Sequence, residues 1–163
     1  MILRTLTIFI LGLSILGCQV TDKKNESPEL SKTQLLEPNY KIAIQFINDY
    51  LDFSNDLKTE TRLIDWFTKR NDLTAEFKNE LKRIIKEAEK NDAEIGLGFD
   101  PILNAQDNPN QFEFDKSDSK YIVVKGVNWP DFKLTLKLKL EENKWLVDGA
   151  GIVNIPLNKR IER

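Results

Sequence analysis

The chain has 163 residues, of which 31% are charged, and its formal net charge is −2. This length suits a single domain with a substantial core, and the slightly acidic balance excludes the basic surface of a nucleic-acid-binding protein. The chain contains no histidine, which removes the commonest general base and zinc ligand and, with them, every serine–histidine or cysteine–histidine nucleophile. We therefore expect no metal, no cofactor and no nucleic-acid partner.

The chain begins with a positive charge, an apolar run and a cysteine, in that order. Arg4 supplies the charge, and the run at 6–16 suits a signal peptide but is shorter than the ~20 apolar residues of a transmembrane helix. The run ends at Ile15-Leu16-Gly17-Cys18, which resembles the lipobox of bacterial lipoproteins. The resemblance implies cleavage before Cys18 and a diacylglycerol thioether on its sulfur, so residues 1–17 are predicted to be a lipoprotein signal peptide.

Cys18 is the only cysteine in the chain, so it has no partner for an intramolecular disulfide or a cysteine metal cluster. The alternative is an ordinary signal peptide with an incidental cysteine, but the residue stands where a lipid acceptor must lie. Gln19 follows it, where the inner-membrane retention signal has aspartate. We therefore expect a lipid-anchored protein of the bacterial cell envelope, on the periplasmic side of the outer membrane.

The rest of the chain divides into a polar segment, one domain and a short tail. Residues 18–38 have little apolar content, which is typical of a flexible tether. The acidic chain as a whole is expected to lack a polybasic patch for anionic lipid. Residues 39–156 contain the periodic apolar positions and form the predicted domain. Residues 157–163 are predicted to be a tail.

Three helices are expected in the first part of the domain. The first begins after Pro38 with Asn39 as its N-cap, the second runs near 59–69, and the third runs from about 74 to 90. Their inward-facing residues are predicted to be Ala43, Phe46, Ile47, Tyr50 and Leu51, then Leu63, Trp66 and Phe67, and finally Leu73, Phe77, Leu81, Ile84, Ile85 and Ala88.

From residue 94 onward the hydrophobic period changes from that of helices to that of strands, after a loop rich in glycine and proline. Gly149 and Gly151 indicate a bulge or bend in the last strand. Helices followed by a meander of strands predict an α+β domain, with three helices packed on a curved antiparallel sheet. The expected strands begin near 112 and cover 112–114, 121–125, 132–140 and 145–153.

The strand at 132–140 has the strictest alternation of apolar and charged residues. Leu136 at its centre is predicted to be buried against the helices. Lys137 beside it is predicted to face solvent, so Lys137→Ala should hardly change the stability of the domain. The lysines of the other face, Lys133, Lys137 and Lys139, either keep the sheet soluble or meet an acidic partner.

Three short segments have a distinctive pattern: Gly98-Phe99-Asp100-Pro101, Asn104-Ala105-Gln106-Asp107 and the KWLVDG end of the last hairpin at 144–149. With them, residues 38–156 resemble the nuclear-transport-factor-2-like superfamily, a cystatin-like cone that ketosteroid isomerase also uses. The chain is most similar to small secreted or lipoprotein domains of undefined function in that superfamily. The resemblance implies a pocket between sheet and helices but little about activity, because one fold hosts many functions.

Six side chains are candidates for lining such a pocket: Tyr50, Trp66, Asp100, Asp107, Tyr121 and Asp148. Asp100 and Asp107 flank a short segment and can reach one end of the fold, where two carboxylates suit acid–base chemistry or a hard cation. Turn formation explains both aspartates equally well, and core packing explains the aromatic residues. Ketosteroid-isomerase-like enzymes work with an aspartate base and a tyrosine, but no position here matches their motif residue by residue.

Two functions are therefore expected. The first is a non-enzymatic envelope domain that binds a protein partner or a small ligand, for example an immunity-type protector against an envelope-acting toxin. The second is a small pocket enzyme of the isomerase or hydrolase kind with an aspartate base. A wet cavity with an inward carboxylate beside a tyrosine would favour the enzyme, whereas an interior filled by Phe and Leu side chains would favour the binding domain.

Replacing the acceptor cysteine tests the lipid anchor. We predict that Cys18→Ser abolishes both incorporation of a fatty-acid analogue and removal of the leader, because serine lacks the thiol that forms the thioether. Metabolic labelling of cells that produce the full chain measures both. Label retained on the serine variant would refute the assignment.

Overall fold

The computed structural model describes residues 38–56 and 62–162. The predicted signal peptide, Cys18, most of the tether and the first residues of the second predicted helix lie outside them. No helix in the described part is long and apolar enough to cross a membrane. The elements described there are α1 (Tyr40–Asn55), α2 (Leu63–Lys69), α3 (Ala75–Asn91), β1 (Phe112–Asp118), β2 (Tyr121–Gly126), β3 (Lys133–Glu141), β4 (Lys144–Ala150) and the 3-10 helix η1 (Leu157–Lys159).

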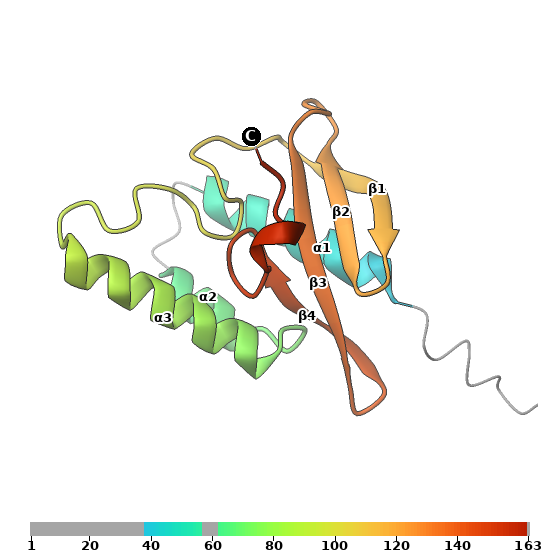
Figure 1. The fold of residues 1–163 in the computed structure, drawn as a ribbon, viewed down its shortest axis with the longest axis horizontal. Coiled ribbons are helices and arrows are strands. Elements are labelled where there is room, and N and C mark those ends of the chain that lie inside the picture. The colour runs from blue at the N-terminus through green and yellow to red at the C-terminus, as the bar shows by residue number, and fades with distance from the viewer. Residues whose placement is uncertain (1–37, 57–61, 163) are drawn as a thin grey trace, which may run out of the picture.

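The four strands form an antiparallel meander in the order β1-β2-β3-β4, so the predicted α+β class and strand order are confirmed. Helix α1 lies behind the sheet in Figure 1 and contacts all four strands. The opposite face, called the outer face below, carries the polar residues of β3. Helix α3 contacts β4 and packs against α2.

Helix α1 buries the five apolar residues predicted from its periodicity. Asn39 precedes it as expected, but its side chain makes no capping hydrogen bond. Asn48 holds the edge of the sheet, because its Nδ2 donates to the Phe112 carbonyl at 3.0 Å and its Oδ1 accepts from the Phe112 N–H at 2.8 Å. This amide occupies the place of a neighbouring strand and so protects the edge of β1.

Helix α3 begins where the chain leaves the open edge of β4. Thr74 is its N-cap and accepts a hydrogen bond from the Phe77 N–H at 3.1 Å. Just before it, Leu73 pairs with Val147, whose N–H donates to the Asp72 carbonyl at 2.8 Å. The start of α3 is thereby fixed to the sheet, and Phe77 is fully buried.

Aromatic rings fill the space between α1, α2 and α3. The Phe46, Phe67 and Phe77 centroids lie 5.5–6.0 Å apart in edge-to-face pairs, which stabilise by about 0.5–1.5 kcal/mol each beyond their buried area. Arg70 covers this cluster, with its guanidinium 4.7 Å from the Trp66 ring. The domain interior on this side is therefore packed with side chains.

A bulge in β4 changes the prediction for Lys137. Lys137 pairs with Gly149 but Leu138 pairs with Val147, so Asp148 is an extra residue. The Asp148 side chain is buried; its Oδ2 lies 2.6 Å from Lys137 Nζ, and its Oδ1 accepts from the Thr74 hydroxyl at 2.6 Å. The bulge predicted for this strand is confirmed. Lys137 is not the solvated lysine expected from the alternation, because it pairs with a buried carboxylate.

The C-terminal segment covers part of the outer face (red in Figure 1). Thr135 is buried there, and its hydroxyl donates to the Lys159 carbonyl at 2.7 Å. Arg160 donates to the carbonyls of Ile152 and Ile155. Lys159 and Arg160, expected in a tail, are thus tied to the sheet and to the chain that follows β4.

Two neighbouring substitutions in β3 test this arrangement. Leu136→Ala should lower the free energy of unfolding by ~2–5 kcal/mol, because Leu136 is fully buried and its truncation leaves a cavity. Lys137→Ala should cost about 1–3 kcal/mol, because it leaves the buried Asp148 carboxylate without its cation. Urea denaturation of the full chain measures both values.

Lys139→Ala is the matched control on the same strand and face. Lys139 pairs with Glu76 and Glu141, which are not buried, so its loss should cost under about 1 kcal/mol. If Lys137→Ala proves no more damaging than Lys139→Ala, the buried pair does not support the bulge.

Candidate functional site

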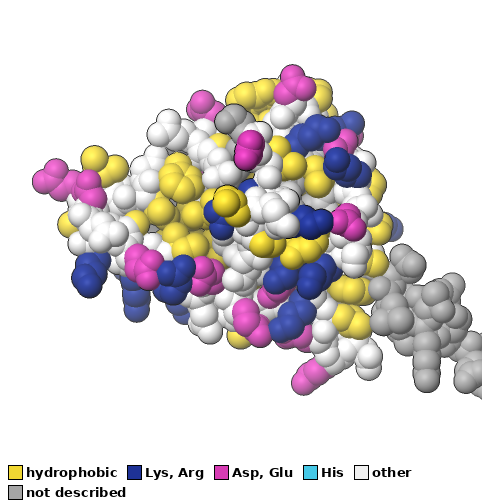
Figure 2. All heavy atoms as spheres, in the orientation of Figure 1, with side chains coloured by type: hydrophobic (Ala, Val, Ile, Leu, Met, Phe, Trp, Pro, Cys, Tyr) yellow, Lys and Arg dark blue, Asp and Glu magenta, His cyan; other side chains and the backbone are white. Residues whose placement is uncertain are grey.

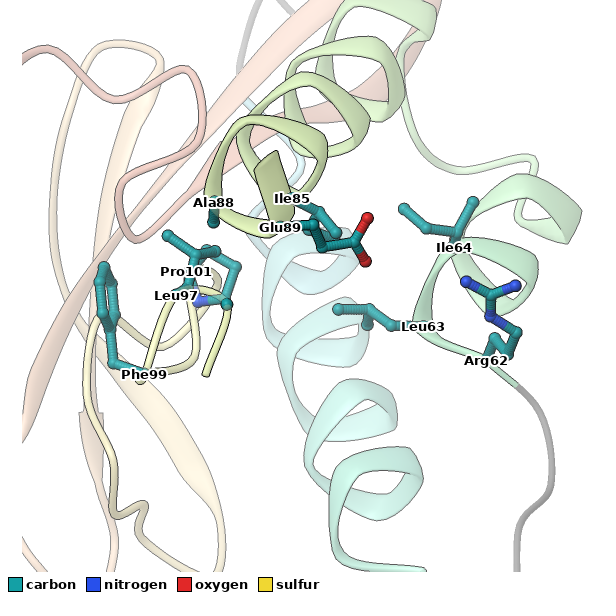
Figure 3. Close-up of a pocket in the computed structure, with 10 residues that line it drawn as sticks. Arg62, Leu63, Ile64, Ile85, Ala88, Glu89, Leu97, Phe99 and Pro101 are labelled. Atoms are coloured by element: carbon teal, nitrogen blue, oxygen red, sulfur yellow. The ribbon is translucent and has the colours of Figure 1, made fainter. Parts of the chain in front are cut away.

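An open groove of about 290 Å³ lies between α2, α3 and the loop that follows α3 (Figure 3). Its floor is apolar, and the charged residues lining it are Arg62 and Glu89. The lining residues are Arg62, Leu63 and Ile64 at α2, Ile85, Ala88 and Glu89 on α3, and Gly96, Leu97, Phe99 and Pro101 in the loop.

The groove exists because α3 is longer than the surface available to cover it. Phe77 and Leu81 near its start are fully buried, but Ile84, Ile85 and Ala88 further along the predicted stripe are only partly buried. Helix α2 has only seven residues and covers the stripe on one side. The loop covers it on the other, which leaves an apolar gap between them.

Asp100 fixes the loop that forms one wall of the groove. Its Oδ1 accepts from the N–H groups of Ile102 and Leu103 at 2.7 and 3.0 Å, and its Oδ2 accepts from the Tyr50 hydroxyl at 2.6 Å. Its own N–H donates to the Ala105 carbonyl. The loop is thereby closed on itself and tied to α1.

Burial dominates the protonation of this pair. It raises the pKa of Asp100 above its ordinary value, against the opposing effect of the hydrogen bonds from Tyr50 and the two backbone N–H groups. Burial, the charge of Asp100 and their hydrogen bond all raise the pKa of Tyr50. Tyr50 therefore stays protonated and donates to a carboxylate that it helps to keep ionised.

Gly151 makes the second clamp on the same loop. It adopts φ +59°, and a Cβ added there would lie 2.4 Å from the carbonyl oxygens of Pro101 and Ile102. The next residue, Ile152, donates its N–H to the Pro101 carbonyl at 3.0 Å. The close approach requires glycine, and it presses the chain after β4 onto the groove wall.

The six candidate residues lie in four places. Tyr50, Trp66 and Asp100 come together beneath the groove wall, with the Tyr50 and Trp66 ring centroids 5.6 Å apart. The others lie elsewhere: Asp107 is exposed in the loop before β1, Tyr121 lies on the outer face, and Asp148 lies in the bulge of β4. In the described part of the chain, no three His, Cys, Asp or Glu side chains are grouped to hold a metal ion.

The groove itself was not anticipated from the sequence. Leu63, Ile85 and Ala88 are expected in the core from the sequence, and Phe99 is noted only within the segment that carries the resemblance. Ile64 and Leu97 are not singled out. The available signal is the apolar stripe of α3, which continues for two turns beyond Leu81, together with the apolar side chains of the glycine-containing loop.

Comparison with known proteins adds no further constraint. The chain matches no family model, no curated protein and no solved structure.

Removing the Tyr50 hydroxyl tests the clamp on the loop. Tyr50→Phe should lower the free energy of unfolding by about 1.5–3 kcal/mol at neutral pH, because a largely buried carboxylate loses its side-chain donor. The loss should shrink as the pH falls through the pKa of Asp100, since the hydrogen bond favours the ionised form. Urea denaturation at a series of acidic pH values measures this.

Tyr40→Phe is the matched control, because Tyr40 lies on the same helix and its hydroxyl accepts only an exposed hydrogen bond from Ser117. Tyr40→Phe should leave the free energy of unfolding nearly unchanged at every pH. A loss for Tyr50→Phe that stays constant down to the lowest pH would show that Asp100 is not the group that the hydroxyl stabilises.

Proposed function

We propose that this protein is a lipid-anchored domain of the bacterial cell envelope that binds a protein partner or a small ligand without catalysing a reaction. The proposed anchor is a diacylglycerol on Cys18, and the proposed binding surface is the groove between α2, α3 and the loop. The observation that carries the proposal is the groove: exposed apolar surface with charged residues beside it is typical of interaction sites.

The state of the buried carboxylates supports binding over catalysis. The pair of Asp100 and Tyr50 is the inward carboxylate beside a tyrosine that the alternative, a pocket enzyme, requires. Its oxygens accept three hydrogen bonds from the protein, however, and Asp148 is engaged by Thr74 and Lys137. Both carboxylates hold segments of the fold, and phenylalanine rings pack the space between the helices.

The proposal includes the cone-shaped, nuclear-transport-factor-2-like fold and a position on the periplasmic side of the outer membrane. Helix α1 lying across an antiparallel meander supports the first, and Gln19 after Cys18 supports the second. An immunity-type protector against an envelope-acting toxin is one partner-binding role that fits these properties.

Site-specific crosslinking tests the groove. We predict that a photo-crosslinking amino acid at Leu97, in the full chain produced in its own cells, forms an adduct that the same group at Leu157 does not form. Leu157 is 80% exposed and lies on η1, away from the groove. Ile64→Glu should abolish the adduct by placing a charge on the apolar floor, and mass spectrometry identifies a protein or a small molecule equally.

Identical adducts at Leu97 and Leu157, or an adduct that survives Ile64→Glu, would show that the groove is not the binding surface. A melting curve for Ile64→Glu that matches the unmodified chain ensures that its effect is local.

A further inference from the structure

Cationic side chains from two distant parts of the chain meet on the outer face of the sheet. Lys116, Lys159 and Arg160 line a hollow of about 320 Å³ between the C-terminal segment and the β1–β2 hairpin. The Nζ atoms of Lys120 and Lys159 lie 5.8 and 5.3 Å from the ring centroid of Tyr121, which lines the same hollow. Figure 2 shows Lys and Arg side chains gathered on this face. These four cations and Tyr121 are called the cationic hollow below.

The cationic hollow differs from the lysine row of β3. There, each lysine has a carboxylate partner: Lys133 pairs with Asp115, Lys137 with Asp148, and Lys139 with Glu76 and Glu141.

In the hollow, Asp118 pairs with Lys159 and is 73% exposed. Among the residues that the structure describes, Lys116 and Lys120 form no ion pair. The hollow therefore has uncompensated positive charge, although the chain as a whole is acidic.

The chain enters the domain beside this hollow. Tyr40, the first residue of α1, accepts a hydrogen bond from the Ser117 hydroxyl at 3.0 Å, and Ser117 lines the hollow. The Tyr40 ring stacks on Phe114 at a centroid distance of 5.2 Å, and Phe114 is 40% exposed. Any link from Cys18 to Tyr40 thus reaches the domain at the edge of the cationic hollow.

We propose that the cationic hollow docks the domain onto anionic phospholipid headgroups of the membrane that holds its anchor. This rests on the proposed function, because it requires the lipid on Cys18. Ammonium and guanidinium groups donate to phosphate oxygens. The exposed Phe114 ring and the half-buried Tyr40 ring stacked on it suit the bilayer interface.

The anchor makes weak contacts sufficient. A covalent link of this kind gives the domain a local concentration at the membrane on the order of millimolar. Each lysine near an anionic surface raises the binding constant about fivefold. The helices α2 and α3 lie on the other side of the domain from β1 in Figure 1. The groove and the hollow share no lining residue, so docking through the hollow leaves the groove uncovered.

Fluorescence quenching in vesicles tests this proposal with the whole lipidated protein. Because Cys18 carries the lipid, Asn158→Cys provides a single free thiol for a fluorophore at the hollow, and Asn91→Cys provides one at the far end of α3. The vesicles contain a quencher lipid in phosphatidylcholine, with or without phosphatidylglycerol. We expect the probe at 158 to be quenched when phosphatidylglycerol is present and the probe at 91 to stay bright in both.

Charge variants make the test specific. Lys116→Ala with Lys120→Ala should lower the docked-to-undocked ratio about 25-fold. The matched control, Lys86→Ala with Lys90→Ala on α3, changes the net charge equally and should leave the ratio unchanged. Added salt should reverse docking by screening.

Three results would overturn the proposal. Equal quenching at 158 with and without phosphatidylglycerol would show that binding of the hollow to the membrane does not depend on headgroup charge. Reversal by inorganic phosphate at an ionic strength where chloride has no effect would identify a site for free phosphate. Failure of the protein to enter vesicles at all would remove the anchor, and with it the proposed function, whereas the first two results leave the anchor intact.

Discussion

Burial of one face of α1 across the four strands is the constraint on which the other contacts depend. Along this single helix, Phe46 packs into the aromatic cluster with α2 and α3, Asn48 closes the edge of β1, and Tyr50 ties down the loop at Asp100. These side chains project in different directions from little more than one turn of the helix, so a shift of the helix would disturb the sheet edge, the helical layer and the groove wall together. The groove wall is thus fixed in part by a helix that does not line the groove.

Two buried carboxylates then specify how the irregular parts of the chain attach to this frame. Asp148 joins the N-cap of α3 to the outer-face lysine Lys137, and Asp100 joins the loop to α1. Burying such groups has a large desolvation cost unless every oxygen is satisfied. Their benefit lies in specificity, because an alternative position of the loop or of α3 would leave a buried charge without its partners.

The regular part of the fold was predictable because periodicity reports burial directly. The buried face of α1 and the inward position of Leu136 follow from local spacing alone. The partner of Lys137 did not follow, because it depends on one extra residue in the neighbouring strand, which local alternation does not reveal. Tyr50 and Asp100 were both candidates for lining a pocket, but Asp100 was expected beside Asp107, and its pairing with Tyr50 was not predicted. The groove was missed because the partial burial of Ile85 depends on where α2 begins.

The cationic hollow, too, could not be predicted from the local sequence. Its cations come from the β1–β2 hairpin and from the C-terminal segment, which are far apart in the sequence. Neither the local sequence nor the acidic net charge of the chain therefore reveals that they gather on one surface. Only the return of the last residues over Thr135 brings them together. The chain enters the domain beside the same hollow, and the groove shares no residue with it. An anchored domain docked in this way would therefore leave its apolar groove open to the aqueous phase. Orientation by charge and recognition by apolar surface would then be separate properties of two surfaces that share no residue, each open to change without loss of the other.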